Sequence, residues 1–306
     1  MIQKILCSSL VAAFLCGAPA AWPKTGSETF EKRSRLSSLS SAPTIKAAIG
    51  LLRSGKSIDA FVMFHDLASA GNSQAMVMLA KLYEEGTGTS AMPAMRVYWL
   101  INAAGLGQPQ AMLELGLIYQ GGKIVEVDVP RSVYWLEQVS SLGSPEASVL
   151  LGAMYFLGEI VDKNVALALD CYLEAANHGS ATAMSLMGAI YLFGSGVKSD
   201  PILARFWLER AAMLGDRDAQ NMFAVMSLQG DGVAPDAIAA RAWWLISGQG
   251  GSGEAKSNLL EQDKVMNKSD AALALELSIR LKKKISLQLS MSKKPHEKKL
   301  VNETML

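Results

Sequence analysis

The sequence is poor in cysteine and histidine, and this scarcity excludes several kinds of chemistry. It holds three cysteines and three histidines in 306 residues. Cys7 and Cys16 fall within an N-terminal segment that we expect to be removed, so Cys171 would have no partner for an intrachain disulfide. The three histidines are His65, His178 and His296, and none has a second potential ligand at the spacing of a zinc site. We therefore predict no metal site and no bound cofactor.

The chain also lacks an excess of charge of either sign. It carries 29 lysines and arginines against 28 aspartates and glutamates, for a net charge of +1. A nucleic-acid-binding protein is expected to carry a basic excess, so we predict no nucleic-acid partner. After residue 22 no apolar run is long enough to span a bilayer, which predicts no integral membrane segment once the N-terminal segment is cleaved.

The N-terminus has the pattern of a secretory signal peptide. Lys4 supplies the positive charge, residues 5–15 supply an apolar core, and Ala18-Pro19-Ala20 is a small-residue cleavage site. We predict cleavage after Ala20 and a periplasmic or secreted mature protein. An uncleaved membrane anchor is the alternative, whereas a lipoprotein signal through Cys16 is disfavoured by the bulky residues before it.

The strongest pattern in the chain is a period of 36 residues. Alanine recurs at this step, at Ala75, Ala111, Ala147, Ala183, Ala219 and Ala255. Tyrosine follows eight residues later in four units, at Tyr83, Tyr119, Tyr155 and Tyr191. Tryptophan marks the second half of four units, at Trp99, Trp135, Trp207 and Trp243. A fixed period of this length is typical of a repeat array, in which each unit packs on its neighbours.

Each unit is predicted to contain two helices. Apolar residues spaced four apart, as in Ala111, Leu115 and Tyr119, form one stripe of an α-helix. Glycines inside this helix would weaken it unless a partner helix approaches closely, at Gly116, Gly152 and Gly188. After a loop, polar residues suited to N-capping recur in one column, at Asp128, Asn164, Asp200 and Asp236. Met92 breaks this column.

These columns resemble the Sel-one-like repeat family, a branch of the tetratricopeptide-type α-solenoids. The pattern Ala-x3-Leu-Gly-x2-Tyr-x2-Gly is complete in residues 111–122 and 147–158. The resemblance covers about residues 43–290. It implies an all-α fold: an α-solenoid of antiparallel helix pairs with a 36-residue repeat, wound as a right-handed superhelix. Ser227 departs from the pattern because it stands in the tyrosine column, and Ile124 and Ile160 replace a loop glycine.

The ends of the chain differ from the repeats. We expect a signal peptide (1–20), a flexible leader (21–42), the repeat solenoid (43–290, about six helix pairs and a C-terminal capping helix) and a disordered basic tail (291–306). Residues 269–290 alternate as a strand would, but their composition favours a helix with Leu273, Leu277, Leu281 and Ile285 in one stripe. Membrane-surface binding through lysines 282–284 is an alternative role for this helix.

The sequence offers no convincing catalytic constellation. Ser195-x2-Lys198 and Lys24-Thr25-Gly26 match two motifs of penicillin-recognising acylases. The first lies in an ordinary repeat loop and the second in the leader, in the reverse of the usual order. We therefore predict no catalytic residue and no enzyme activity. An envelope hydrolase acting on peptidoglycan or β-lactams remains the alternative function.

The positions between the recurring columns of the repeat are the candidates for function. In helix-pair solenoids the first helix of each unit lines the concave side. The residues two, six and nine positions after each alanine are therefore expected to face the groove. The candidate partner-binding groove that results is mostly apolar: Val77, Lys81, Leu113, Leu117, Gln120, Val149, Phe156, Leu192, Asn221, Val225 and Leu228. Nearby methionines could help it adapt to a partner, at Met112, Met154, Met184, Met222 and Met226.

Two interpretations of these positions stay open. An exposed apolar groove would mark a binding site for a helix or an extended segment of another protein. Tight winding of the array would instead bury the same side chains as core. We favour an exported, non-enzymatic adaptor that binds a protein or peptide, and the sequence does not identify that partner. A purely structural scaffold, whose groove is filled by its own leader or cap, is a further alternative.

Overall fold

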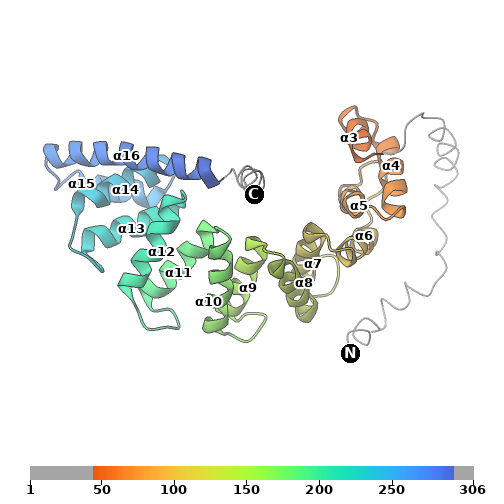
Figure 1. Ribbon diagram of the computed structural model, residues 1–306, viewed down its shortest axis with the longest axis horizontal. Coiled ribbons are helices and arrows are strands. Elements are labelled where there is room, and N and C mark those ends of the chain that lie inside the picture. The colour runs from red at the N-terminus through yellow and green to blue at the C-terminus, as the bar shows by residue number, and fades with distance from the viewer. Residues whose placement is uncertain (1–43, 293–306) are drawn as a thin grey trace, which may run out of the picture. The chain divides into compact units, whose positions relative to one another are not determined.

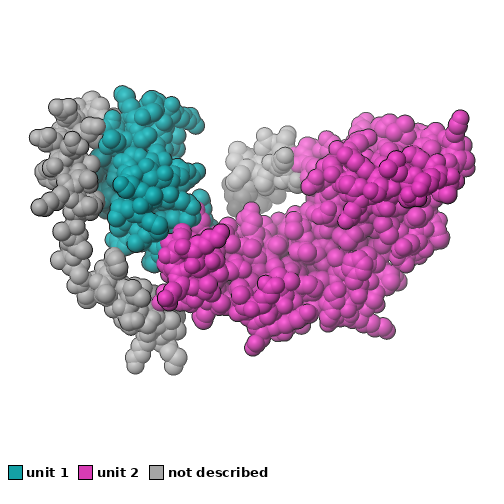
Figure 2. Space-filling model, turned by 180° about the vertical axis from the view of Figure 1, so that it is seen from behind, with its two compact units in different colours: residues 1–111 teal, residues 112–306 magenta. Residues whose placement is uncertain are grey.

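The computed structural model describes residues 44–292, and every helix or strand in this range is an α-helix, as predicted (Figure 1). The predicted signal peptide and leader, and residues 293–306 of the predicted tail, lie outside the described range. Contacts divide the chain into two compact units, residues 1–111 and 112–306, coloured teal and magenta in Figure 2. The boundary falls within helix α7 (Pro109–Gly121).

In the first unit, consecutive helices pack against one another. The described part comprises α3 (Ile45–Arg53), α4 (Ser57–Ser69), α5 (Ser73–Glu85) and α6 (Pro93–Gly105). The pair α3 and α4 precedes the first repeat of the 36-residue array and is joined by a short turn. Gly55 adopts a positive φ in the turn between its two helices.

The second unit continues the alternation of two kinds of helix. Its first helices are most of α7, then α9 (Pro145–Leu157), α11 (Ala181–Phe193), α13 (Arg217–Gln229) and α15 (Gly253–Gln262). Its second helices are α8 (Val129–Ser141), α10 (Val165–Asn177), α12 (Pro201–Met213) and α14 (Ala237–Gln249). Each helix from α8 to α14 packs on the next along the chain, and a longer helix, α16 (Lys268–Ser292), packs on α14 and α12.

Polar side chains start most of these helices, as the sequence predicts for the second helices. The side chain at the N-cap accepts a hydrogen bond from the backbone N–H three residues later, at Asp128, Asn164, Asp200 and Asp236. Met92 makes no such bond, and α6 begins there with Pro93. The first helices have equivalent caps that were not predicted from the sequence, at Asn72, Ser144, Ser180, Asp216 and Ser252. A missing cap costs about 1 kcal/mol, so these residues fix where helices start.

The glycines inside the first helices lie where a second helix approaches closely, as predicted. A Cβ atom on Gly152 would lie 2.5 Å from Tyr172 Cε1, and one on Gly188 would lie 2.5 Å from Leu208 Cγ. Gly116 likewise leaves no room beside Leu136, where a Cβ would lie 2.7 Å from Cδ2. The larger residue of each pair is almost completely buried. The absent side chain therefore sets the distance between the two helices of a repeat.

The departure at Ser227 is accommodated by a second departure. Ser227 is buried, and its hydroxyl donates a hydrogen bond to the Phe223 carbonyl. Arg205, where the three preceding repeats have valine or leucine, places its guanidinium 4.4 Å from the centre of the Phe223 ring and reaches the Ser227 hydroxyl at 3.5 Å. An arginine from α12 thus packs on the ring next to the serine that replaces tyrosine.

The C-terminal segment is helical, as its composition indicates, but its predicted stripe is partly wrong. Ala274, Ser278 and Ile285 are buried, whereas Leu273 is exposed. The buried line is displaced because α16 packs on the second helices α14 and α12, so tertiary contacts select the face that is covered. In the described part of the chain no helix is long and apolar enough to cross a membrane.

The close approach of paired helices gives a test of the fold. Replacing Gly188 by Ala should lower the free energy of unfolding by about 1–3 kcal/mol, because the added methyl group overpacks the contact with Leu208. The matched control is Gly121→Ala, since a Cβ there meets nothing within 4 Å. Chemical denaturation followed by circular dichroism measures both. Equal stability of the two variants would contradict the role given to Gly188.

Candidate protein-binding face

In the second unit, one side of α7, α9, α11 and α13 carries mostly apolar residues that are exposed or half-buried, with Glu114 and Gln229 as polar exceptions. Leu117, Leu157 and Phe193 are 44%, 57% and 71% exposed. Half-buried apolar residues lie on the same side of their helices. We call this surface the first-helix face and define it by Leu117, Leu150, Ala153, Leu157, Leu186, Ala189, Phe193, Met222 and Val225. Single exposed leucines are common, but an apolar row across neighbouring helices is typical of an interaction surface.

The predicted groove residues divide into three groups. Three are exposed, namely Lys81, Leu117 and Leu228. Six are half-buried, namely Leu113, Gln120, Val149, Phe156, Leu192 and Val225. Two are buried, namely Val77 and Asn221. The set is therefore neither wholly exposed nor wholly buried as core.

Placing Val77 and Asn221 on an exposed surface was wrong, and Asn221 shows the reason. Its side-chain amide donates to Glu254 Oε2 at 2.8 Å and its oxygen accepts from Asn258 at 3.2 Å, both on the next first helix, α15. An offset of two residues from the alanine column thus points toward the neighbouring repeat. Residues at offsets of three and six are mostly half-buried, and the most exposed apolar residues lie at an offset of ten, which is why Leu157 and Phe193 were missed.

The methionines do not form the surface that the sequence suggests. Met112, Met154, Met184 and Met226 are buried, and only Met222 of the five predicted methionines is half-buried. They lie on the core side of the first helices, where they fill space between repeats. The adaptability predicted for the groove therefore cannot come from these four side chains.

Charged residues border the first-helix face at both ends of its helices. Glu146 and Asp218 are exposed in the first turns of α9 and α13. A carboxylate there is favoured by the helix dipole. The nearby Arg217 donates to the Gly250 carbonyl at 2.8 Å. Beyond the other end of α9, the Lys163 ammonium lies 5.5 Å from the centre of the Phe156 ring.

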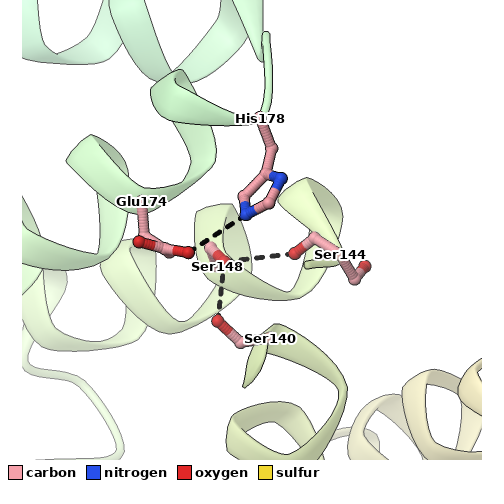
Figure 3. A network of polar contacts seen from close by, with 5 residues as sticks. All are labelled: Ser140, Ser144, Ser148, Glu174 and His178. Atoms are coloured by element: carbon pink, nitrogen blue, oxygen red, sulfur yellow. Dashed lines mark hydrogen bonds and ion pairs between the residues drawn. The ribbon is translucent and has the colours of Figure 1, made fainter. Parts of the chain in front are cut away.

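Serines, a histidine and a glutamate lie close together, and these are the residue types that form the catalytic site of many hydrolases (Figure 3). His178 Nε2 lies 3.1 Å from Glu174 Oε1. The Ser148 and Ser140 hydroxyls are 2.7 Å apart, and Ser148 also donates to the Ser144 carbonyl at 3.1 Å. In this cluster no hydrogen bond joins a serine hydroxyl to the imidazole, and Ser148 is almost completely buried. A nucleophilic serine needs that bond and access to substrate, so this arrangement is structural.

The other predicted chemical candidates are also separate. Ser195 and Lys198 lie in the loop after α11, and their partner motif at residues 24–26 lies outside the described range. Ser69 is 3.5 Å from His65 on the same helix, longer than a nucleophile–base contact. Within residues 44–292, histidine, cysteine, aspartate and glutamate form no group of three or more that could hold a metal ion.

Cys171 is half-buried and free, and its environment opposes ionisation. Burial, together with the negative charges of Asp170 and Glu137, raises the pKa of its thiol from 9.0 to about 11. The thiolate is the nucleophilic form of cysteine, so a raised pKa makes this thiol inert. Burial likewise raises the pKa of the adjacent Tyr172 to about 12. The structure agrees with a packing role for Cys171 in the tryptophan column.

The raised pKa predicts slow alkylation of Cys171. At a pH below 9 the folded protein should react with iodoacetamide about 100-fold more slowly at Cys171 than the unfolded chain does, because a shift of two pKa units removes that share of thiolate. Mass spectrometry of the Cys171 peptide separates it from Cys7 and Cys16. Equal rates with and without denaturant would show that the folded thiol ionises normally.

Comparisons with known proteins agree with the repeat architecture. The Sel1 repeat matches residues 73–107, 109–144, 145–180, 181–216 and 217–252. A Sel1 repeat protein from Oxalobacter formigenes is similar in structure, with 27% identity and a TM-score of 0.63 over 78% of this chain and 99% of that one. A protective antigen of uropathogenic Escherichia coli with an SLR fold has 25% identity and a TM-score of 0.66, over 87% of this chain and 57% of its own.

No curated protein matches the chain. Sel1 repeat proteins are generally scaffolds for protein–protein interaction. The five matched repeats cover more than half of the sequence and coincide with the helix pairs from α5 to α14. The chain therefore belongs to the Sel1 repeat family.

Proposed function

We propose that the protein is an exported, non-enzymatic scaffold that binds another protein or peptide on its first-helix face. The observation that carries the proposal is the exposure of Leu117, Leu157 and Phe193 on one side of successive first helices. A large part of each of these residues faces water. A bound segment would cover them and gain the free energy of burying apolar surface.

The size of this gain decides which contacts matter. Burying a leucine or phenylalanine side chain completely is worth about 1.5–3 kcal/mol. Two such side chains, already half exposed or more, can therefore change a dissociation constant by tenfold or more. Since a row of apolar positions across parallel helices suits an amphipathic helix or an extended segment, we expect a partner with alternating or helically spaced apolar residues.

Export is the second part of the proposal and is supported by the sequence alone. Lys4, the apolar residues 5–15 and the small residues before Ala21 match a secretory signal. Cys171 is the one cysteine outside residues 1–20, so no intrachain disulfide would be needed or possible after cleavage. The repeats instead depend on packing and helix caps.

No feature favours the hydrolase alternative. The serine, histidine and glutamate of Figure 3 lack the bond that would activate a serine. Ser195 ends a helix turn, with its backbone N–H bonded to the Ile190 carbonyl, as expected of a repeat loop. The proposal therefore rests on binding and includes no reaction.

The binding proposal predicts a face-specific loss of partners. In a pull-down from an envelope extract of the producing cell, Leu157→Glu with Phe193→Glu should reduce recovery of the bound proteins at least about tenfold, because two apolar contacts become buried charges. The control is Ile202→Glu with Phe206→Glu on α12, where both side chains are also exposed. Circular dichroism checks that each variant keeps its helicity.

Two outcomes would contradict this part of the proposal. One is an unchanged set of recovered proteins for a folded Leu157 and Phe193 variant. The other is an equal loss for the control on α12. In either case the first-helix face would not be the binding surface.

Export predicts a defined mature N-terminus. N-terminal sequencing of the protein from the producing cell should begin at Ala21, and Ala20→Arg should leave the precursor uncleaved because the processing site requires a small residue. The matched control is Ala13→Leu within the apolar segment, which preserves hydrophobicity and should be processed normally. A mature protein that begins at residue 1 would overturn the export proposal.

A further inference from the structure

The C-terminal end of α16 lies beside the turn that precedes α13. The nearest side chain to Gly215 is Leu289, whose Cδ1 would lie 3.7 Å from a Cβ at this glycine. Leu214 beside it is half-buried, whereas Leu106 and Leu142, the equivalent residues of other repeats, are each 57% exposed. The end of α16 therefore covers this turn, and the chain continues from there into residues 293–306.

The turns between repeats lie along one edge of the second unit. Figure 3 shows two consecutive turns together, with His178 next to the segment between α8 and α9. A Cβ at Gly143 would lie 3.1 Å from His178 Cε1, which confirms that these turns are in contact. Gly215 is the equivalent glycine two repeats after Gly143. Each of these turns leads directly into a first helix, so this edge also borders the first-helix face.

The border between this edge and the first-helix face is acidic. Asp218 lies three residues after Gly215, and Glu146 lies three residues after Gly143. Both carboxylates are exposed in the first turns of their helices. Arg217 carries the one positive charge beside Asp218 at the start of α13, and it is bonded to the Gly250 carbonyl. A segment that crosses this border toward the apolar residues would benefit from positive charge.

Residues 293–306 have the composition that this path favours. Four lysines come first, at Lys293, Lys294, Lys298 and Lys299, with one acidic residue, Glu297, between them. Apolar residues follow at Leu300, Val301, Met305 and Leu306, with Glu303 between them. Extended, 14 residues span at most about 46–50 Å. A first helix of 13 residues is about 20 Å long, and packed helices lie about 10 Å apart. The segment is thus long enough to pass from Gly215 over α13 to the exposed end of α11.

We propose that residues 293–306 occupy the first-helix face of the second unit and compete there with the partner. The lysines would meet Asp218 and Glu146, and the apolar residues would cover Leu186 and Phe193. This regulation deepens the proposed function and rests on it, since it assigns an internal competitor to the same surface. It also defines the partner's chemistry: a segment with apolar side chains next to lysine or arginine.

A weak interaction is sufficient for such a competitor. Exposed ion pairs contribute about 0–1 kcal/mol each, so the lysines alone bind weakly. A tethered segment, however, has an effective concentration in the millimolar range. An intrinsic dissociation constant of about 1 mM would therefore leave the face occupied in about half of the molecules. An external partner with micromolar affinity could still displace the segment.

Photocrosslinking in the full-length protein tests the proposal. With p-benzoylphenylalanine in place of Phe193, irradiation at low protein concentration should join this position to residues 293–306 within the monomer, as mapped by mass spectrometry. The matched control places the same group at Phe206, an exposed phenylalanine on α12. Absence of the crosslink from Phe193, or an equal yield from Phe206, would overturn the proposal. Covalent dimers would identify a second copy as the occupant and also overturn it.

Charge reversal tests the role of the acidic border. Glu146→Lys with Asp218→Lys should reduce the intramolecular yield several-fold, and reversing Lys293 and Lys294 to Glu should do the same. Combining both sets should restore the yield. A yield that is insensitive to all three variants would overturn the proposed path of the segment.

The outcome can be separated from that of the proposed function. If residues 293–306 compete with a partner, reversing their lysines should raise recovery in the pull-down, whereas the Leu157 and Phe193 variant should still lose it. Loss of binding in that variant without any crosslink from Phe193 would overturn only the internal competitor. A crosslink with no face-dependent recovery of any partner would instead contradict the proposed scaffold function.

Discussion

The structure depends on the close contact between the two helices of each repeat. Gly152 and Gly188 have no side chain where Tyr172 and Leu208 approach, and these two larger residues are almost completely buried as a result. A single helix pair cannot bury both of its apolar sides, so each pair packs on the next. Helix caps and the glycines with positive φ then fix the lengths of the helices and turns. These lengths together make up the repeat period.

This mode of packing leaves one side of the first helices less buried than the side that faces the core. Residues on that side do not determine the fold, so their character can differ from repeat to repeat. In α5 it is charged: Lys81 pairs with Glu85 at 3.7 Å, and Glu84 pairs with Arg96 at 2.7 Å. In α9 and α11 the same side carries Leu157 and Phe193. An apolar surface is therefore a local property of the second unit and not a by-product of the repeat.

The sequence predicted those features that a single helix or a close contact determines. The caps at Asp200 and Asp236, the glycine contacts and the helical C-terminal segment belong to this group. The features that it missed depend on neighbours from other repeats. Asn221 is buried by α15, and the covered face of α16 is chosen by α14 and α12. A period of 36 residues shows which positions are equivalent but not which neighbour each one faces.

Departures from the repeat pattern show how the array tolerates change. Ser148 stands where three other repeats have methionine, and Ser140, which replaces an alanine, places its hydroxyl 2.7 Å from that of Ser148, from α8 to α9. Ser227 replaces a tyrosine and is contacted by Arg205, where the three preceding repeats have valine or leucine.

In both cases a buried polar group finds a polar partner in the same or the adjoining helix. Leaving such a group without a hydrogen bond would cost about 1–3 kcal/mol. Because each compensation is local, one repeat can diverge without disturbing repeats further along. The same independence allows the first-helix face to acquire binding residues in α9 and α11 while the array keeps its packing.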